Sequence, residues 1–327
     1  MADTETTSKP KIAIGPAGTA PSWDWIGVRT ARSLDDSFEV ELFDDFNTLP
    51  DVSIIMIVKH RPPRQFIEGA VERGIRLAYL PVDRYQTTEE IEADALFLAA
   101  CDSVLSHSRG LLPYLELHAR QVGFIEHESI YALESLAEFR PEGFVLWIGA
   151  CEHLPHIIGW LEQNEAGADI KLLTNYKNKA ARMEAHMRAR RMGISLNFQD
   201  GTINGHETVL WSEVAQEHLM RTCKAAIDIK GADFNQATKP PTKAQQFIAS
   251  GIPFSCNTDS SVAAYLKWRG FDVADAGDWD RLLSRDYWVE TRAFAPKLRN
   301  WTSAAAVRRS YVNALQGLLG PTRHQKA

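Results

Sequence analysis

The chain has 327 residues, of which 45% are hydrophobic and 24% charged, a composition typical of soluble globular proteins, and its length favours two domains over one. Its net charge of −6, from 36 Lys and Arg against 42 Asp and Glu, creates no overall attraction for nucleic acid. Any anionic ligand must therefore be held by local groups. The four cysteines are far apart and form no CxxC pair, which predicts buried thiols and argues against a disulfide framework or a zinc site.

The chain contains no apolar run of the roughly 18 residues that a membrane-spanning helix requires. Its first ten residues are polar and acidic, so we expect a disordered lead-in and no signal peptide. These features predict a cytoplasmic protein without a membrane span. Association with a membrane surface stays open, and so does the oligomeric state.

The first half alternates short apolar runs with longer helical patterns, which is typical of a parallel sheet covered by helices on both faces. The expected strands cover residues 11–15, 38–43, 52–58, 75–82, 103–108 and 122–126. The expected helices cover residues 26–34, 63–73, 88–100 and 110–120.

The same alternation starts again after residues 128–143, where the sequence PEG marks a hinge. The expected strands of the second half cover residues 144–150, 169–175, 194–198, 208–210, 225–230, 252–257 and 271–275. The expected helices cover residues 153–164, 176–193, 212–222, 242–250, 260–269, 279–283, 287–293 and 304–319.

The fold class that follows is α/β, with two doubly wound Rossmann-like domains. We expect a lead-in over residues 1–10, an N-terminal Rossmann-like domain over 11–140, a C-terminal Rossmann-like domain over 141–302, and a C-terminal helix and tail over 303–327. Ligands of open α/β sheets bind at the carboxyl ends of the strands, so two such domains facing a central cleft would bind their ligands there. The C-terminal helix is long enough to pack back on the first domain.

Residues 239–253, KPPTKAQQFIASGIP, combine a loop, a helix and the signals that start and stop it. Pro240 and Pro241 suit a helix entry, Thr242 can cap the helix, and Gly251 can take the left-handed conformation after it. The first helical turn offers backbone N–H groups and the positive end of the helix dipole beside Lys239 and Lys243, which is a site for phosphate. An ordinary crossover helix with surface lysines explains this stretch equally well when it is taken alone.

Residues 241–253, PTKAQQFIASGIP, resemble the donor-site helix of the GT-B glycosyltransferases, in particular the family 4-like group, whose pattern is P-x-K-x-x-E-(Y/A)-x-A-x-G-x-P. The upstream helix ending in LMRTCK and the strand AAIDIK fit the C-terminal domain of that group. The motif-level similarity covers residues 212–275, and the two-domain layout extends it over the whole chain.

The resemblance implies a metal-independent glycosyltransferase of the hexosyltransferase type, with no cofactor and with a nucleotide sugar, a UDP-sugar in the first instance, as donor. The donor diphosphate would lie at Lys239, Thr242 and Lys243, with Gly149 in the same site. Gln246 stands where the group has a glutamate that bonds the ribose, and Thr238 stands where it has a second glutamate. The loop over residues 150–153 carries Glu152 and His153 in place of an Arg and Lys pair.

The loop IGPAGTAPSWDW, residues 14–25, follows the first strand, and in GT-B enzymes it faces the cleft. The resemblance therefore assigns Gly18, Thr19 and Trp23 to the sugar or acceptor and makes Asp24 a candidate base. Asp24 as a simple helix cap is the competing interpretation.

The loop KHRPPR, residues 59–64, follows a buried strand and has the same expected location. His60 is its catalytic candidate, and Arg61 is a candidate for binding the sugar or an anionic acceptor. A basic surface loop is the simpler interpretation. His107, with Ser106 or Ser108 as a helix cap, is interpreted as a satisfied surface histidine.

The basic segment 177–191 raises nucleic acid or anionic lipid as partners, but its pattern favours a solvated amphipathic helix. His153 and His156 lack a third ligand with metal spacing, so we predict no metal site. Two other functions remain open: a sugar-nucleotide epimerase of the same fold, and a nucleotide-sugar-binding protein that has lost catalysis. The acceptor, the sugar and the stereochemical outcome stay undecided.

Overall fold

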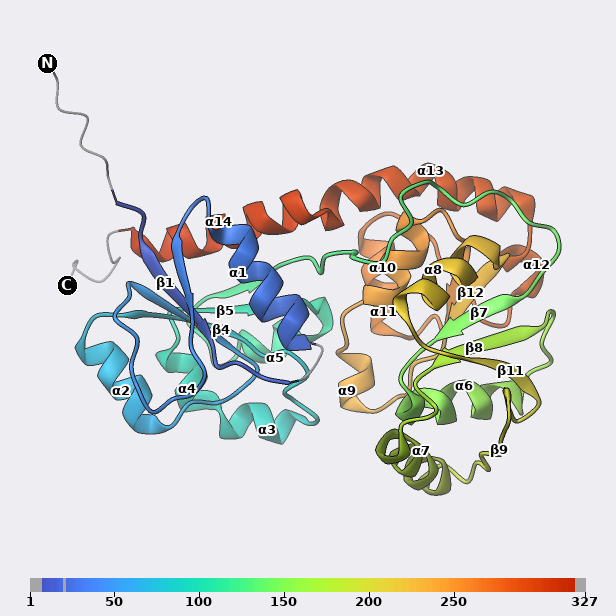
Figure 1. The fold of residues 1–327 in the computed structure, drawn as a ribbon, viewed down its shortest axis with the longest axis horizontal. Coiled ribbons are helices and arrows are strands. Elements are labelled where there is room, and N and C mark those ends of the chain that lie inside the picture. The colour runs from blue at the N-terminus through green and yellow to red at the C-terminus, as the bar shows by residue number, and fades with distance from the viewer. Residues whose placement is uncertain (1–7, 20–21, 321–327) are drawn as a thin grey trace, which may run out of the picture. The chain divides into compact units, whose positions relative to one another are not determined.

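The structure is a computed structural model that describes residues 8–19 and 22–320, and it is shown in Figure 1. The chain falls into two compact units: unit 1 is formed by the chain up to His127 together with the chain from Ala304 onward, and unit 2 is Glu128–Ser303. Residues 1–7 of the expected lead-in lie outside the described residues.

Unit 1 is built on a six-stranded sheet in the order β2-β1-β3-β4-β5-β6, parallel throughout. Its strands are β1 (Lys11–Gly15), β2 (Glu39–Leu42), β3 (Ile54–Val58), β4 (Arg76–Leu80), β5 (Ser103–Ser106) and β6 (Val122–Phe124). All five side chains of β3 are buried, as expected for a strand covered on both faces. The predicted parallel sheet is therefore confirmed.

The helical segments of unit 1 are η1 (Trp23–Val28), α1 (Arg29–Leu34), α2 (Arg64–Glu72), α3 (Thr88–Ala93), α4 (Ala95–Ala100), η2 (Arg109–Leu111), α5 (Leu112–Leu115) and α14 (Ala304–Leu319). The prediction of one helix over 88–100 is wrong, because the helix breaks at Asp94. That carboxylate is 1% exposed and forms ion pairs with Arg61 and Arg84. The predicted helix over 110–120 is limited to η2 and α5.

The C-terminal helix α14 packs on α1 of unit 1, as predicted, and in Figure 1 one end of α1 lies next to α14 while the other end points away from it. Val307, Tyr311, Leu315 and Leu318 are buried in the same core as the strands β1 and β3. The hydroxyl of Tyr311 lies 2.9 Å from Nε2 of His107, whose Nδ1 lies 3.0 Å from the carbonyl oxygen of Ile125. His107 is thus a half-buried residue that contacts α14 through Tyr311, and the prediction of a surface histidine is wrong. Burial lowers the pKa of its imidazole to about 3.

Unit 2 is built on an eight-stranded sheet in the order β14-β13-β12-β7-β8-β11-β10-β9. Its strands are β7 (Val145–Ile148), β8 (Ile170–Thr174), β9 (Phe198–Gln199), β10 (Thr202–Ile203), β11 (His206–Leu210), β12 (Ala225–Asp228), β13 (Phe254–Cys256) and β14 (Ala274–Asp275). The pairings are parallel except at β10, which runs antiparallel to both β9 and β11.

The helical segments of unit 2 are η3 (Cys151–His153), α6 (Leu154–Leu161), α7 (Lys179–Arg191), α8 (Glu213–Thr222), α9 (Phe234–Ala237), α10 (Thr242–Ala249), α11 (Ser261–Trp268), α12 (Trp279–Leu282) and α13 (Arg285–Thr302). The short helix α9 was not predicted, and α13 runs well beyond the predicted 287–293, through Pro296. The cysteines are buried thiols, as predicted. Among the described helices, none is long and apolar enough to cross a membrane.

Each sheet has one point at which the strand order reverses direction. In unit 1 this point lies between β1 and β3, and in unit 2 it lies between β7 and β12. At such a point the connections leave the neighbouring strands toward opposite faces, and a crevice opens at the carboxyl ends of those strands. The loops after β7 and β12 therefore form the expected ligand site of unit 2.

Candidate functional site

The strand β12 ends in a buried carboxylate, that of Asp228, which is 2% exposed. Its Oδ2 lies 2.9 Å from Nζ of Lys230, and its Oδ1 lies 3.0 Å from Nζ of Lys243. A buried carboxylate is stable only when charges or hydrogen bonds compensate it, and here two lysines do so. Although burial acts to raise it, the pKa of Asp228 is held below its usual value by these two lysines.

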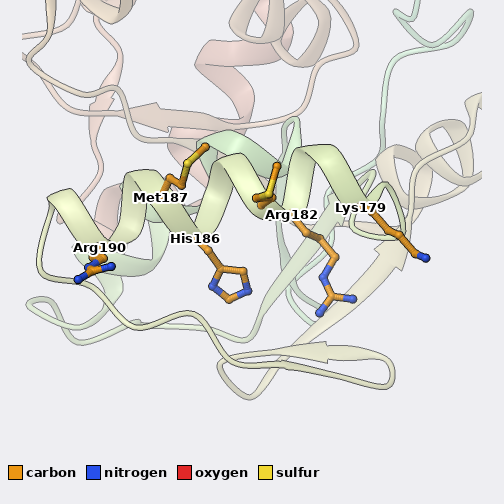
Figure 2. Close-up of a pocket in the computed structure, with 6 residues that line it drawn as sticks. Lys179, Arg182, His186, Met187 and Arg190 are labelled. Atoms are coloured by element: carbon orange, nitrogen blue, oxygen red, sulfur yellow. The ribbon is translucent and has the colours of Figure 1, made fainter.

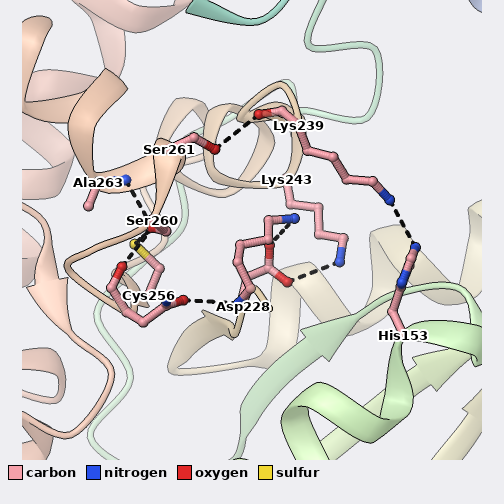
Figure 3. Close-up of polar contacts among 10 residues, drawn as sticks. His153, Asp228, Lys239, Lys243, Cys256, Ser260, Ser261 and Ala263 are labelled. Atoms are coloured by element: carbon pink, nitrogen blue, oxygen red, sulfur yellow. Dashed lines mark hydrogen bonds and ion pairs between the residues drawn. The ribbon is translucent and has the colours of Figure 1, made fainter. Parts of the chain in front are cut away.

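The helix α10 begins at Thr242, the position that the sequence predicts. The predicted capping role of Thr242 is wrong, because Pro241 occupies the N-cap position and no side chain caps the helix. The first N–H groups of any α-helix have no acceptor in the helix's own backbone, and in α10 no side chain caps them either. Lys243 extends from this turn toward Asp228 (Figure 3).

The C-terminal end of α10 is the one predicted. Gly251 has a φ of 73°, the left-handed conformation, and the N–H of Ile252 donates to the carbonyl oxygen of Phe247 over 3.0 Å. Side chains other than glycine adopt this φ only with strain. The glycine thus ends the helix and turns the chain into β13.

The strand β7 leads to Gly149, a predicted donor-site residue, beside the side chain of Trp147. A Cβ at position 149 would overlap the indole ring of Trp147, so only glycine lets the backbone pass this close to the ring. Nζ of Lys243 lies 5.2 Å from the centre of the same ring, within the range of a cation–π contact. The indole therefore connects the end of β7 to the first turn of α10.

The side chain of His153, at the end of η3, lies between two cations. Nζ of Lys239 is 3.0 Å from its Nε2, and Nη1 of Arg188 on α7 is 3.3 Å from its Nδ1 (Figure 3 shows the lysine). Burial first, and then the surrounding Lys239, Lys243, Lys230 and Arg188, hold the pKa of His153 far below its usual value. A neutral imidazole in this position adds no charge of its own to the cations around it.

The site as a whole therefore holds an excess of positive charge. The cations Lys230, Lys239, Lys243 and Arg188 gather around His153 near the carboxyl ends of β7 and β12. They outnumber the carboxylates that pair with them, which are the buried Asp228 with Lys230 and Lys243, and Glu184 with Arg188 at 3.8 Å. Burial, followed by the repulsion of Lys230 and Lys239, lowers the pKa of Lys243 to about 8 in spite of Asp228. An oxyanion with more than one negative charge would relieve this repulsion.

Gln246 is buried, at 6% exposure, and its Oε1 accepts a hydrogen bond of 3.3 Å from Nε2 of Gln216 on α8. Thr238 ends α9, where its hydroxyl donates to the carbonyl oxygen of Phe234 over 2.8 Å. The two positions that stand for the glutamates of the resembling group thus both form hydrogen bonds within unit 2. The role of Gln246 in binding a ribose stays a prediction.

The acceptor residues predicted in unit 1 lie in the loops after β1 and β3, the two strands at which the order of that sheet reverses. Gly18 and Thr19 are exposed in the first loop, and His60 is exposed in the second. Trp23 is 9% exposed and packs into the core of unit 1. Asp24 is exposed inside η1, whose N-cap is Ser22, so the interpretation of Asp24 as a helix cap is wrong.

Arg61 does not extend as a simple surface charge. Its Nη1 lies 2.9 Å from Oδ1 of Asp94, and Nη2 of Arg84 lies 3.4 Å from Oδ2 of the same carboxylate. Lys59 and Asp83, which follow the neighbouring strands β3 and β4, have φ angles of 67° and 47°. Among the described residues no group of three His, Cys, Asp or Glu side chains could hold a metal ion.

No protein-family model and no curated protein matches the chain, but solved structures share its fold. Anabaena HepE, solved in complex with UDP-glucose, aligns with a TM-score of 0.60 and 11% identity over 94% of this chain and 100% of its own. AviGT4, a glycosyltransferase involved in avilamycin A biosynthesis, aligns with a TM-score of 0.57 and 12% identity over 95% of this chain and 98% of its own.

A putative UDP-N-acetylglucosamine 2-epimerase from Listeria monocytogenes aligns with a TM-score of 0.51 and 9% identity over 95% of this chain and 97% of its own. The chain thus has the fold of the GT-B glycosyltransferases, as its donor-helix motif predicts. At such low identity the alignments establish the fold and leave the activity to the residues of the site.

Proposed function

We propose that the chain is a glycosyltransferase that transfers a sugar from a nucleoside diphosphate sugar, a UDP-sugar in the first instance, to an acceptor. The observation that carries this proposal is the excess of positive charge around His153, where Lys230, Lys239 and Lys243 meet at the reversal point of the unit 2 sheet. The complexes of HepE with UDP and with UDP-glucose support the choice of nucleotide.

The lysines have a chemical role in this reaction. Breaking the bond between the sugar and the diphosphate leaves negative charge on the departing oxygen, and cations already in place stabilise that charge in the transition state. Lys243 and Lys239 would neutralise the diphosphate, Thr242 would offer it the first turn of α10, and Gly149 would allow it to approach the backbone. Gln246 would contribute to the ribose site.

The acceptor side of the reaction would use the loops after β1 and β3. An acceptor hydroxyl oxygen forms a bond to the anomeric carbon as the bond to the diphosphate breaks, and a base takes the hydroxyl proton. Asp24 is the candidate base for an inverting transfer, with His60 as the second catalytic candidate. Gly18, Thr19 and Arg61 would contact the acceptor or the transferred sugar, whereas Trp23 packs into the core of unit 1.

The test is the affinity for UDP, measured by isothermal titration calorimetry on the full chain. Lys243→Ala and Lys239→Ala should each weaken UDP binding by roughly 10- to 100-fold, the value of a charge-assisted hydrogen bond to phosphate. Lys267→Ala removes an exposed lysine of α11 and serves as the control, with unchanged affinity expected. UDP binding that is equal in all four proteins would contradict the proposed donor site.

The epimerase is the second candidate, because the Listeria monocytogenes protein shares the fold. NMR spectra of UDP-N-acetylglucosamine incubated with the protein alone separate the two. An epimerase changes the configuration of the sugar when no acceptor is present. A transferase releases UDP at a rate that depends on the concentration of the acceptor. A protein that binds UDP and turns over no UDP-sugar with any acceptor would be the catalytically inactive alternative.

A further inference from the structure

The helix α7 buries only a narrow strip of its surface. Asn178 caps its N-terminus by accepting a hydrogen bond of 3.1 Å from the N–H of Ala181, and Ala185 and Ala189 are its buried residues. Small alanines on one side let the helix lie close to the rest of unit 2. The opposite side, drawn in Figure 2, is left to the solvent.

This exposed side has a shallow pocket with both apolar and cationic walls. Lys179, Arg182, Met183, His186, Met187 and Arg190 line it. Met183 is 63% exposed and Met187 is 42% exposed, so two thioether side chains lie in solvent beside the basic ones. In Figure 2 the labelled basic side chains leave the helix on one side and Met187 leaves it on the other.

Part of the basic side is held in place by Phe198 of β9. The guanidinium carbon of Arg182 lies 4.5 Å from the centre of that ring, and the ring of His186 lies 5.1 Å from it. Lys179 and Arg190, both exposed, lie at opposite ends of the pocket-lining face. Over 13 residues the helix presents a face about 20 Å long.

The charge of this segment is opposite to that of the chain. Residues 177–191 contain six Lys and Arg against a single Glu, in a protein whose net charge is −6. Arg188 turns inward to His153, and the other five basic residues are exposed or partly exposed. The acidic remainder repels polyanions, so an anionic partner can approach favourably at this face.

We propose that this face of α7 docks on the surface of a membrane that contains anionic lipid. A cationic stripe is attracted to anionic headgroups, and exposed apolar side chains that adjoin the stripe can enter the interface below those headgroups. Nucleic acid would use the basic residues but gives no role to two exposed methionines. The lipid surface uses both.

The experiment is co-sedimentation of the full chain with vesicles of phosphatidylcholine alone and of phosphatidylcholine with 30% phosphatidylglycerol. We expect binding to the anionic vesicles alone, and weaker binding as salt rises. Lys179→Gln with Arg190→Gln should weaken it roughly 30-fold, since each basic side chain near an anionic surface contributes about fivefold. Met183→Gln with Met187→Gln should also weaken binding, while leaving its salt dependence unchanged.

Lys267→Gln with Lys297→Gln removes the same charge from exposed positions on α11 and α13 and is the matched control. Far-UV circular dichroism of every variant shows whether each is folded, and this measurement depends neither on the proposed UDP site nor on the vesicles. The proposal is overturned if anionic vesicles do not sediment the protein, or if the control pair loses as much vesicle binding as the α7 pair. It is also overturned if single-stranded DNA displaces the methionine variant and the wild type from the vesicles equally well, because the methionines would then contribute nothing to vesicle binding.

Discussion

At the scale of single residues, Lys243 is the side chain on which the donor site depends most. It belongs to the first turn of α10 and contacts both the carboxylate of Asp228 and the ring of Trp147. The surrounding cations and its burial, which lower its pKa to about 8, make its charge sensitive to pH near neutrality. Few surface lysines would respond in this range, because their usual pKa is about 10.4.

This gives a pH dependence with a definite sign. Phosphate oxygens bind the protonated amine, so UDP affinity should be full at pH 7 and fall by up to about tenfold at pH 9, one unit above the pKa of Lys243. Titration calorimetry of UDP at several pH values measures it. In Lys243→Arg the guanidinium stays charged, and the loss between pH 7 and 9 should disappear. An equal loss in that variant would assign the titration to another group.

At the scale of elements, α10 shows how much local sequence signals determine. The proline pair before it and the glycine after it predict both of its ends, because these residues act through their own backbone dihedral angles and need no tertiary information. The wrong cap assignment at Thr242 is an error of one residue, because Pro241 takes the N-cap position. The missed break at Asp94 has the opposite cause, since this carboxylate pairs with Arg61 and Arg84, which lie outside the helical segment.

The left-handed end of α10 can be tested by substitution. Gly251→Ala should lower the stability of unit 2 by about 1–2 kcal/mol, because a Cβ is strained at a φ of 73°. Chemical denaturation followed by tryptophan fluorescence measures the change. The control is Gly317→Ala in α14, where the new methyl has no neighbour within 4 Å beyond the adjoining residues and the backbone of its own helix. A helical conformation there favours alanine by about 0.5–1 kcal/mol. Equal effects of both substitutions would refute the assigned role of Gly251.

At the scale of the whole molecule, the sequence predicts the parallel part of both sheets, because strands buried along their whole length, such as β3, carry their signal in consecutive residues. The candidate site was predictable only in part. The positions of Lys239 and Lys243 in the site are predicted by the residues that start and stop α10, which are the proline pair before it and Gly251 after it. Lys230 and His153 are brought to the same place by strand order, which no local pattern contains. Lys230 is the last residue of one predicted strand and His153 follows another, however, and the carboxyl end of a strand is itself a signal.

The folding of unit 1 depends on the C-terminal part of the chain, whereas the folding of unit 2 does not. Unit 2 is one continuous segment, whereas unit 1 needs the chain from Ala304 onward to complete its core. The buried side chains of Val307, Tyr311, Leu315 and Leu318 each contribute about 1.5–3 kcal/mol on burial. Their sum is comparable with the total stability of a domain, about 5–15 kcal/mol.

A chain ending at Ser303 should therefore lose the folded state of unit 1 and keep that of unit 2. Hydrogen exchange followed by mass spectrometry should show fast exchange in β1, β3 and β4 and continued protection in β7 and β12. Because the lysines of the donor site all belong to unit 2, the truncated chain should still bind UDP, with an affinity that Lys243→Ala reduces as in the full chain. Retained protection of β3, or loss of UDP binding together with unit 1, would show that the units do not fold and bind in this independent way.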